Sequence, residues 1–169
     1  MHSDAEVEQK IQKAHTWFLK NKTGRTWWWT NAVEDRFEKL SNVHGLMLTR
    51  LPEYAELMTK EMGKPLAQSE GEIMKSAGMI EWSIKHSLEL MRDRELKTHQ
   101  LKAFVTHDAV GPILDIVPWN FPFWMPFKSM IPPLVLGNPI LLKHAPSTPL
   151  CALALEKLFI DAGFDEGEY

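Results

Sequence analysis

Two short polar segments hold the side chains best suited to chemistry, and each follows an apolar run. Residues 118–122 (PWNFP) come directly after residues 113–117, and residues 143–147 (KHAPS) come directly after residues 140–142. If both apolar runs are strands of one open α/β sheet, both polar segments lie beyond carboxyl ends, where ligands bind in such folds. The spacing therefore predicts a ligand site at this edge.

Three groups near this edge suit a nucleotide. The Asn120 amide can donate to a developing oxyanion, and the Lys143 ammonium can bind hydroxyl or phosphate groups. A helix is predicted to begin at Thr148, with Pro149 in its first position, so free backbone donors there would add positive character. The alternative interpretation is two strand-end turns that hold a capped asparagine and a solvated lysine.

The elements before this edge are predicted to be helical. Apolar residues recur every three or four positions through residues 7–18, 33–58 and 73–91, which indicates amphipathic helices. Pro52 predicts a kink or restart near Leu51. Gly63 with Pro65 predicts a helix end there, so that the next helix runs over about residues 66–91.

After residue 94 the period changes. Residues 101–107 and 113–117 are predicted strands, and the second of these is expected to be buried on both faces. A proline-bearing helix over about 124–136 leads to a buried strand at 140–142, and a last helix ends at Gly163. A strand–helix–strand–helix order with short connections is typical of an open α/β unit.

Composition excludes several classes of protein. The 169 residues include 19 Lys+Arg, 22 Asp+Glu and one Cys, and 44% are hydrophobic. The balance of charge argues against a nucleic-acid partner, a single cysteine excludes an intrachain disulfide, and no apolar run is long enough for a membrane span. The histidines lack metal-ligand spacing, so no metal site is expected. We expect a cytoplasmic protein.

Several ordered motifs resemble the aldehyde dehydrogenase superfamily. Segments of the succinate-semialdehyde dehydrogenase-like branch are the most similar to FPFW after Asn120 and to KHA at residues 143–145. The segments that carry the resemblance are 61–67 (EMGKPLA), 118–122 (PWNFP), 136–138 (LGN), 142–143 (LK), 148–150 (TPL) and 162–167 (AGFDEG).

The resemblance implies an α/β fold in which N-terminal helices pack on the first strands of a Rossmann-like cofactor-binding sheet. The whole chain would be the N-terminal part of an aldehyde dehydrogenase fold that is itself incomplete. Residues 1–95 would form a helical layer, about 96–110 an oligomerisation-arm hairpin, and 111–169 a partial cofactor-binding unit. A homo-oligomer or a complementary chain would then be the protein partner.

The resemblance also implies site residues. Asn120 would match the asparagine whose amide helps to hold the oxyanion, and Lys143 would match the lysine that contacts the adenosine ribose. Pro146 stands where NAD-preferring members often have a glutamate, so NADP is expected to be accepted at least as well as NAD. The cofactor-binding residues implied are Ile116, Val117, Pro118, Trp119, Asn120, Lys143, His144, Ala145 and Pro146.

The implied function is NAD(P)-dependent oxidation of a small aldehyde, of the succinic semialdehyde type, to the carboxylic acid. The sequence stops at Tyr169, before the family's cysteine nucleophile, its glutamate base and its glycine-bearing cofactor turn. We therefore expect the chain alone to be inactive. The alternative is a non-catalytic, truncated or split-gene product that acts as a docking subunit.

Three features test these expectations. Cys151 shares a helical stripe with Leu155 and Leu158, so it is expected to be packed and inert rather than nucleophilic. Asp115 lies inside a predicted buried strand, where burial would raise its pKa. Residues 27–29 (WWW) are interpreted as a docking patch rather than a stacking platform for nucleic acid or sugar.

Overall fold

The computed structural model describes residues 2–21, 31–99 and 102–169. The tryptophans at 27–29 lie outside them. In element order, the chain forms α1 (Asp4–Asn21), α2 (Asn31–Thr49), α3 (Leu51–Met62), α4 (Leu66–Leu90), β1 (Arg94–Leu96), β2 (Ala103–Val105), β3 (Ile113–Ile116), α5 (Trp124–Val135), β4 (Ile140–Lys143) and α6 (Pro149–Asp161).

The helix boundaries follow local sequence signals. Ser3 and Glu6 form a capping box at the start of α1, in which each side chain accepts the other residue's backbone N–H. The predicted break near Leu51 is confirmed, because α2 ends at Thr49 and α3 begins at Leu51. Gly63 ends α3 with φ +73°, a conformation that glycine adopts without strain, and its N–H bonds to the Thr59 carbonyl.

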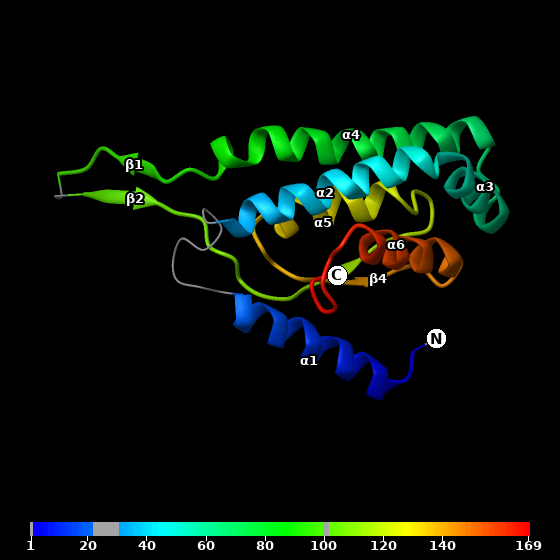
Figure 1. The fold of residues 1–169 in the computed structure, drawn as a ribbon, viewed down its shortest axis with the longest axis horizontal. Coiled ribbons are helices and arrows are strands. Elements are labelled where there is room, and N and C mark those ends of the chain that lie inside the picture. Colours follow the sequence, from blue (N-terminus) through cyan, green and yellow to red (C-terminus); the bar gives the residue numbers. More distant parts are fainter. Residues whose placement is uncertain (1, 22–30, 100–101) are drawn as a thin grey trace.

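A β-hairpin extends from the body after α4. β1 and β2 pair antiparallel, with Arg94 opposite Val105 and Leu96 opposite Ala103. Figure 1 shows the hairpin projecting well away from the helices. The hairpin begins two residues before its predicted start at 96, and an oligomerisation role for it stays a prediction.

The C-terminal unit has the predicted strand–helix–strand–helix order. β3 and β4 pair in parallel, with Ile113 opposite Ile140 and Ile116 opposite Lys143. α5 packs between α4 and the two strands, and Figure 1 shows α1 on the other side of the strands from α4. The fully buried α5 residues Phe127 and Met130 join the helical layer to the sheet in one core.

The expectation that β3 is buried on both faces is wrong. Ile113 and Asp115 face α5 and are half-buried, whereas Leu114 and Ile116 are 62% and 66% exposed. Successive side chains of a strand point to opposite faces, and the described residues leave the second face of β3 largely uncovered. An apolar run thus identified the strand but not how many of its faces are covered.

The buried apolar residues of α1 lie in its second half. Ala14 and Phe18 are buried, while Val7 and Ile11 of the same stripe remain exposed. Gly167, at φ +94°, approaches α1 so closely that an added Cβ would lie 2.7 Å from the Lys13 carbonyl oxygen. This position therefore requires glycine.

Candidate functional site

The two predicted site segments lie side by side. Ile116 and Lys143 are register partners at the carboxyl ends of β3 and β4. The Val117 N–H also donates to the Lys143 carbonyl oxygen at 3.2 Å, which extends the pairing by one step into both loops. The predicted adjacency is confirmed, although a cofactor role for these residues stays a prediction.

The first loop, residues 117–123, presents a mixed surface. Val117 is buried and Pro118 is half-buried, whereas Trp119 is 55% exposed and Asn120 is also exposed. The Asn120 side chain therefore lies at the surface of the strand-end edge. The backbone carbonyl oxygen of Asn120 accepts a hydrogen bond from Lys64 Nζ at 2.8 Å.

Lys64 belongs to a buried ion pair that sequence reasoning missed. Its ammonium pairs with Glu72 Oε2, and the two side chains are 8% and 2% exposed. The other carboxylate oxygen, Oε1, accepts the backbone N–H groups of Phe123 at 2.8 Å and Trp124 at 2.9 Å. Glu72 in α4 thus caps the N-terminus of α5, where negative charge is favoured.

The aromatic ring of Phe121 completes the environment of Lys64. The ammonium lies 4.1 Å from the ring centroid, which is within the range of a cation–π contact. Lys64 therefore contacts three groups: a carboxylate, a carbonyl oxygen and an aromatic face. The sequence signal for this lysine is the segment 61–67, a motif that by itself gives its lysine no role.

The second loop is connected to the first by His144. The Ala145 N–H can only donate, at 2.8 Å, so Nδ1 is the acceptor and Nε2 carries the hydrogen that the Pro122 carbonyl oxygen accepts at 2.9 Å. The Thr148 hydroxyl also lies 2.9 Å from Nδ1. The buried His144 side chain therefore fixes the spacing of the two loops, and Ala145 beside it is buried as well.

On this loop the side chains of Lys143, Pro146 and Ser147 are exposed and so remain open to a ligand. Together with Ile116, Trp119 and Asn120 they form the accessible part of the predicted cofactor edge. Val117, His144 and Ala145 support this edge from inside.

The expected free donors at the α6 N-terminus are not there. Glu61, at the end of α3, accepts the N–H of Leu150 at Oε1 and that of Cys151 at Oε2, both at 2.8 Å. Thr148 occupies the predicted N-cap position, but its side chain forms no capping hydrogen bond and instead contacts His144. A carboxylate from the helical layer thus occupies the positive end of α6.

Two titratable groups near the edge behave as their surroundings require. Cys151 is 0% exposed, and burial raises the pKa of its thiol, which disfavours the thiolate, as the packed interpretation expects. Partial burial raises the pKa of Asp115, although a hydrogen bond from the Ser129 hydroxyl at 2.7 Å opposes this shift. The carboxylate in β3 is therefore paired rather than isolated.

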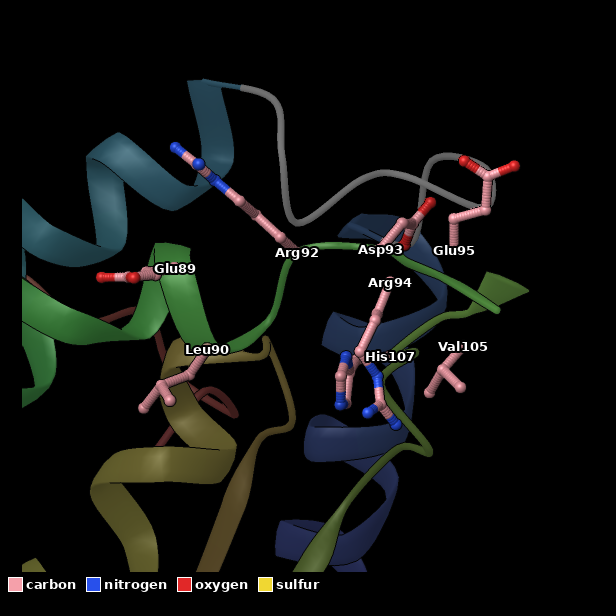
Figure 2. A pocket seen from close by; sticks show the side chains of 8 residues that line it. All are labelled: Glu89, Leu90, Arg92, Asp93, Arg94, Glu95, Val105 and His107. Atoms are coloured by element: carbon pink, nitrogen blue, oxygen red, sulfur yellow. The ribbon is translucent and has the colours of Figure 1, made fainter. Parts of the chain in front are cut away.

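A pocket of about 670 Å³ lies elsewhere, between the end of α4 and the hairpin (Figure 2). Its lining includes acidic Glu89 and Asp93 and basic Arg92 and Arg94. Glu89 lies 17 residues after Glu72 on the same helix, which corresponds to about 25 Å at 1.5 Å per residue. The pocket is therefore separate from the strand-end edge, and its mixed charges indicate no single ligand.

Within the described ranges, no cluster of three or more His, Cys, Asp or Glu side chains is arranged to hold a metal ion. The helices of the described part include none that is long and apolar enough to cross a membrane.

Comparison with known proteins gives a consistent family. A sequence model of the aldehyde dehydrogenase family matches residues 1–168. The succinate semialdehyde dehydrogenase [NAD(P)+] Sad of Escherichia coli is 34% identical over 164 residues, and a probable succinate-semialdehyde dehydrogenase [NADP(+)] of Synechocystis is 34% identical over 168 residues. These matches cover 97% and 99% of this chain.

The fold has the same relatives. The crystal structure of succinic semialdehyde dehydrogenase from Streptococcus pyogenes in complex with NADP+ superimposes with a TM-score of 0.90 at 29% identity, covering 98% of this chain and 35% of that one. The chain spans 34% and 36% of the lengths of the two curated relatives. It corresponds to an N-terminal portion of that fold. The chain therefore belongs to the aldehyde dehydrogenase family.

Proposed function

We propose that this chain forms the first part of an NAD(P)-dependent aldehyde dehydrogenase that oxidises a small semialdehyde, of the succinic semialdehyde type, to its carboxylic acid. The observation that carries the proposal is the match of residues 1–168 to the family, together with relatives whose names specify succinate semialdehyde. The geometry of the strand-end edge supports it.

The accessible residues at this edge fit the adenosine half of a dinucleotide. The exposed Lys143 ammonium lies at a strand end, where it can bind ribose hydroxyls, and the exposed faces of Ile116 and Trp119 can pack against a sugar. Because Glu61 and Glu72 occupy the nearby helix N-termini, we assign no cofactor phosphate to them. Bound nicotinamide would supply the hydride acceptor.

The chemical role that we assign to this chain belongs to Asn120. When a nucleophile adds to the aldehyde carbonyl, the oxygen becomes negative, and an amide N–H already aimed at it lowers the barrier. Cys151 is not that nucleophile, because its thiol is buried and its thiolate is disfavoured. The 169-residue polypeptide alone should therefore show no turnover.

We further propose that NADP is accepted at least as well as NAD. Pro146 is exposed and carries no charge to repel a 2′-phosphate, and Lys143 on the same loop attracts one. The name of the Synechocystis relative specifies NADP(+), and the Streptococcus structure contains NADP+. A preference for NAD of tenfold or more, about 1.4 kcal/mol, would contradict this.

The activity can be tested by replacing the equivalent N-terminal third of the Escherichia coli relative with this chain. Formation of reduced cofactor with succinic semialdehyde is then followed by absorbance. Asn120→Ala should lower kcat about a hundredfold to a thousandfold, whereas Gln68→Ala, which removes an exposed amide on α4, should not. Turnover that is equal in wild type and Asn120→Ala would reject the proposed role.

One observation favours the second candidate, a non-catalytic chain that docks on another polypeptide. Leu114 and Ile116 give β3 a largely exposed apolar face, and an exposed apolar patch on a folded protein often marks an interaction site. Light scattering at micromolar concentration tests this. A monodisperse monomer would argue against docking of two copies of this chain through this face.

A further inference from the structure

The loop that carries Asn120 has no regular secondary structure of its own. Between β3 and α5 the chain forms only bends and turns, so the position of each backbone group depends on what it contacts. Three buried side chains hold four of these groups: Lys64 the Asn120 carbonyl, His144 the Pro122 carbonyl, and Glu72 the amides of residues 123 and 124.

We propose that Lys64 and Glu72 are positioning residues that set where the Asn120 amide lies, a proposal that rests on the oxyanion role proposed for Asn120. The Lys64 ammonium donates to the backbone carbonyl oxygen of Asn120, 2.8 Å from Nζ. Glu72 fixes the chain three and four residues later, at the first turn of α5. The direct ion pair between them makes both anchors one unit.

This unit positions Asn120 because the side chain itself is exposed. A surface amide is not immobilised by packing around it, so its position depends on the backbone to which it is attached. Electrostatic catalysis needs donors that are already aimed at the oxyanion, and a misplacement of about 1 Å from a distant change can cost about a hundredfold in rate. Lys64 holds the backbone carbonyl oxygen of Asn120 and so fixes the peptide group next to which the Asn120 side chain is attached.

The pair is also cooperative, because neither member can remain charged and buried alone at low cost. Taking two charges out of water is compensated only when their geometry and additional hydrogen bonds are in place. Here those bonds go to the loop backbone. Removing either side chain should therefore release the loop at both anchors, whereas an ordinary surface lysine would release nothing.

The test uses the 169-residue chain and two nuclear magnetic resonance measurements, the side-chain amide signal of Asn120 and the hydrogen exchange of the Phe123 and Trp124 amides. Lys64→Met should shift the Asn120 signal and speed exchange at both amides at least tenfold relative to core amides of α6. Lys64→Arg, which retains a donor and a charge, should restore both. Lys60→Met, at an exposed lysine of α3, is the matched control.

Glu72→Gln is a second, milder variant that keeps the shape and one acceptor oxygen, in case Lys64→Met does not fold. It should speed exchange at residues 123 and 124 and shift the Asn120 signal. Unchanged Asn120 signals in a folded variant, or faster exchange that is equal throughout the chain, would overturn the positioning role.

Kinetics of the chimera with the Escherichia coli relative separate the two proposals. If Asn120→Ala leaves kcat of the chimera unchanged, the oxyanion role fails, while the exchange data still test the anchors. If Asn120→Ala lowers kcat and Lys64→Met leaves the Asn120 signal and the exchange of its loop unchanged, the positioning role alone fails.

Discussion

The two helices that follow the strand-end loops are capped in the same way but held differently. A glutamate of the helical layer accepts two N–H groups at the start of each, Glu72 at α5 and Glu61 at α6. Glu72 is 2% exposed and paired with Lys64, whereas the hydrogen bonds of Glu61 lie at the surface or half-buried. The two caps share the same chemistry but differ in burial, so we expect their removal to cost different amounts of stability.

The comparison also separates the roles of the two loops. The α5 loop carries Asn120, for which we propose an oxyanion role, and its anchor is the buried Lys64–Glu72 ion pair. The α6 loop carries Lys143, an exposed lysine for which we propose a cofactor contact made by a long, flexible side chain. The buried anchor thus lies beside the residue whose proposed role requires a fixed position.

Glu72→Ala should have the largest effect on stability. It removes the cap of α5 and leaves the Lys64 charge buried without its carboxylate, so the free energy of unfolding should fall by about 3–5 kcal/mol. Urea denaturation followed by tryptophan fluorescence measures this. Glu81→Ala, at an exposed position of α4, is the control and should change little.

A double-mutant cycle sharpens this result. Lys64→Met with Glu72→Ala should cost less than the sum of the two single changes, because the second change removes the charge that the first left unpaired. Strict additivity would mean that the two side chains act independently, against the geometry of the pair.

Glu61→Ala should cost about 1 kcal/mol, as other losses of an N-cap do. Its two acceptor atoms serve the first turn of α6 near solvent, so water can replace them in part. The same denaturation experiment gives the value. A loss as large as that of Glu72→Ala would remove the distinction between buried and surface caps.

The Cys151 thiol reports whether this smaller loss is local. It lies in the turn that Glu61 caps and is fully buried, so a thiol reagent should react with it slowly in the native chain. Glu61→Ala should speed that reaction severalfold, because it loosens the turn and removes a carboxylate that helps burial to raise the pKa of the thiol. Glu56→Ala, at an exposed position of the same helix, should not. Fast reaction in the wild-type chain would contradict the packed interpretation.

Local signals were sufficient to predict the elements but not their anchors. Pro52 and Gly63 act on their own neighbours, and the stripe of Cys151 and Leu155 repeats within one helix, so the sequence predicted them correctly. The Glu61 cap joins residues 89 positions apart. No periodicity or spacing rule connects such residues, because the contact depends on how the helical layer packs on the sheet.

The same reasoning explains the errors at the edge itself. Thr148 is a good N-cap residue locally, but a carboxylate from α3 outcompetes its hydroxyl for the α6 donors, and the hydroxyl turns to His144. The run of apolar residues in β3 gave the strand, but whether Leu114 is covered depends on neighbours that the run does not encode. The adjacency of the loops followed from parallel pairing alone.

Asp115→Asn should have the smallest effect and serves as the contrast to both capping glutamates, because this carboxylate of the same edge accepts from a hydroxyl and caps no helix. Partial burial raises its pKa, so its contribution to stability is present below the unfolded-state pKa, about 3.9, and is lost as pH rises through the folded-state pKa. The asparagine keeps an acceptor for Ser129 and has no such loss. Asp115→Asn should therefore match the wild type near pH 3 and exceed it at pH 7 by a few tenths of a kcal/mol, after allowance for solvent screening of a half-exposed group. Urea denaturation at both pH values measures the difference. A variant that is less stable than the wild type at pH 7 would show that the charge of Asp115 stabilises the fold, and would place it with the capping glutamates instead of apart from them.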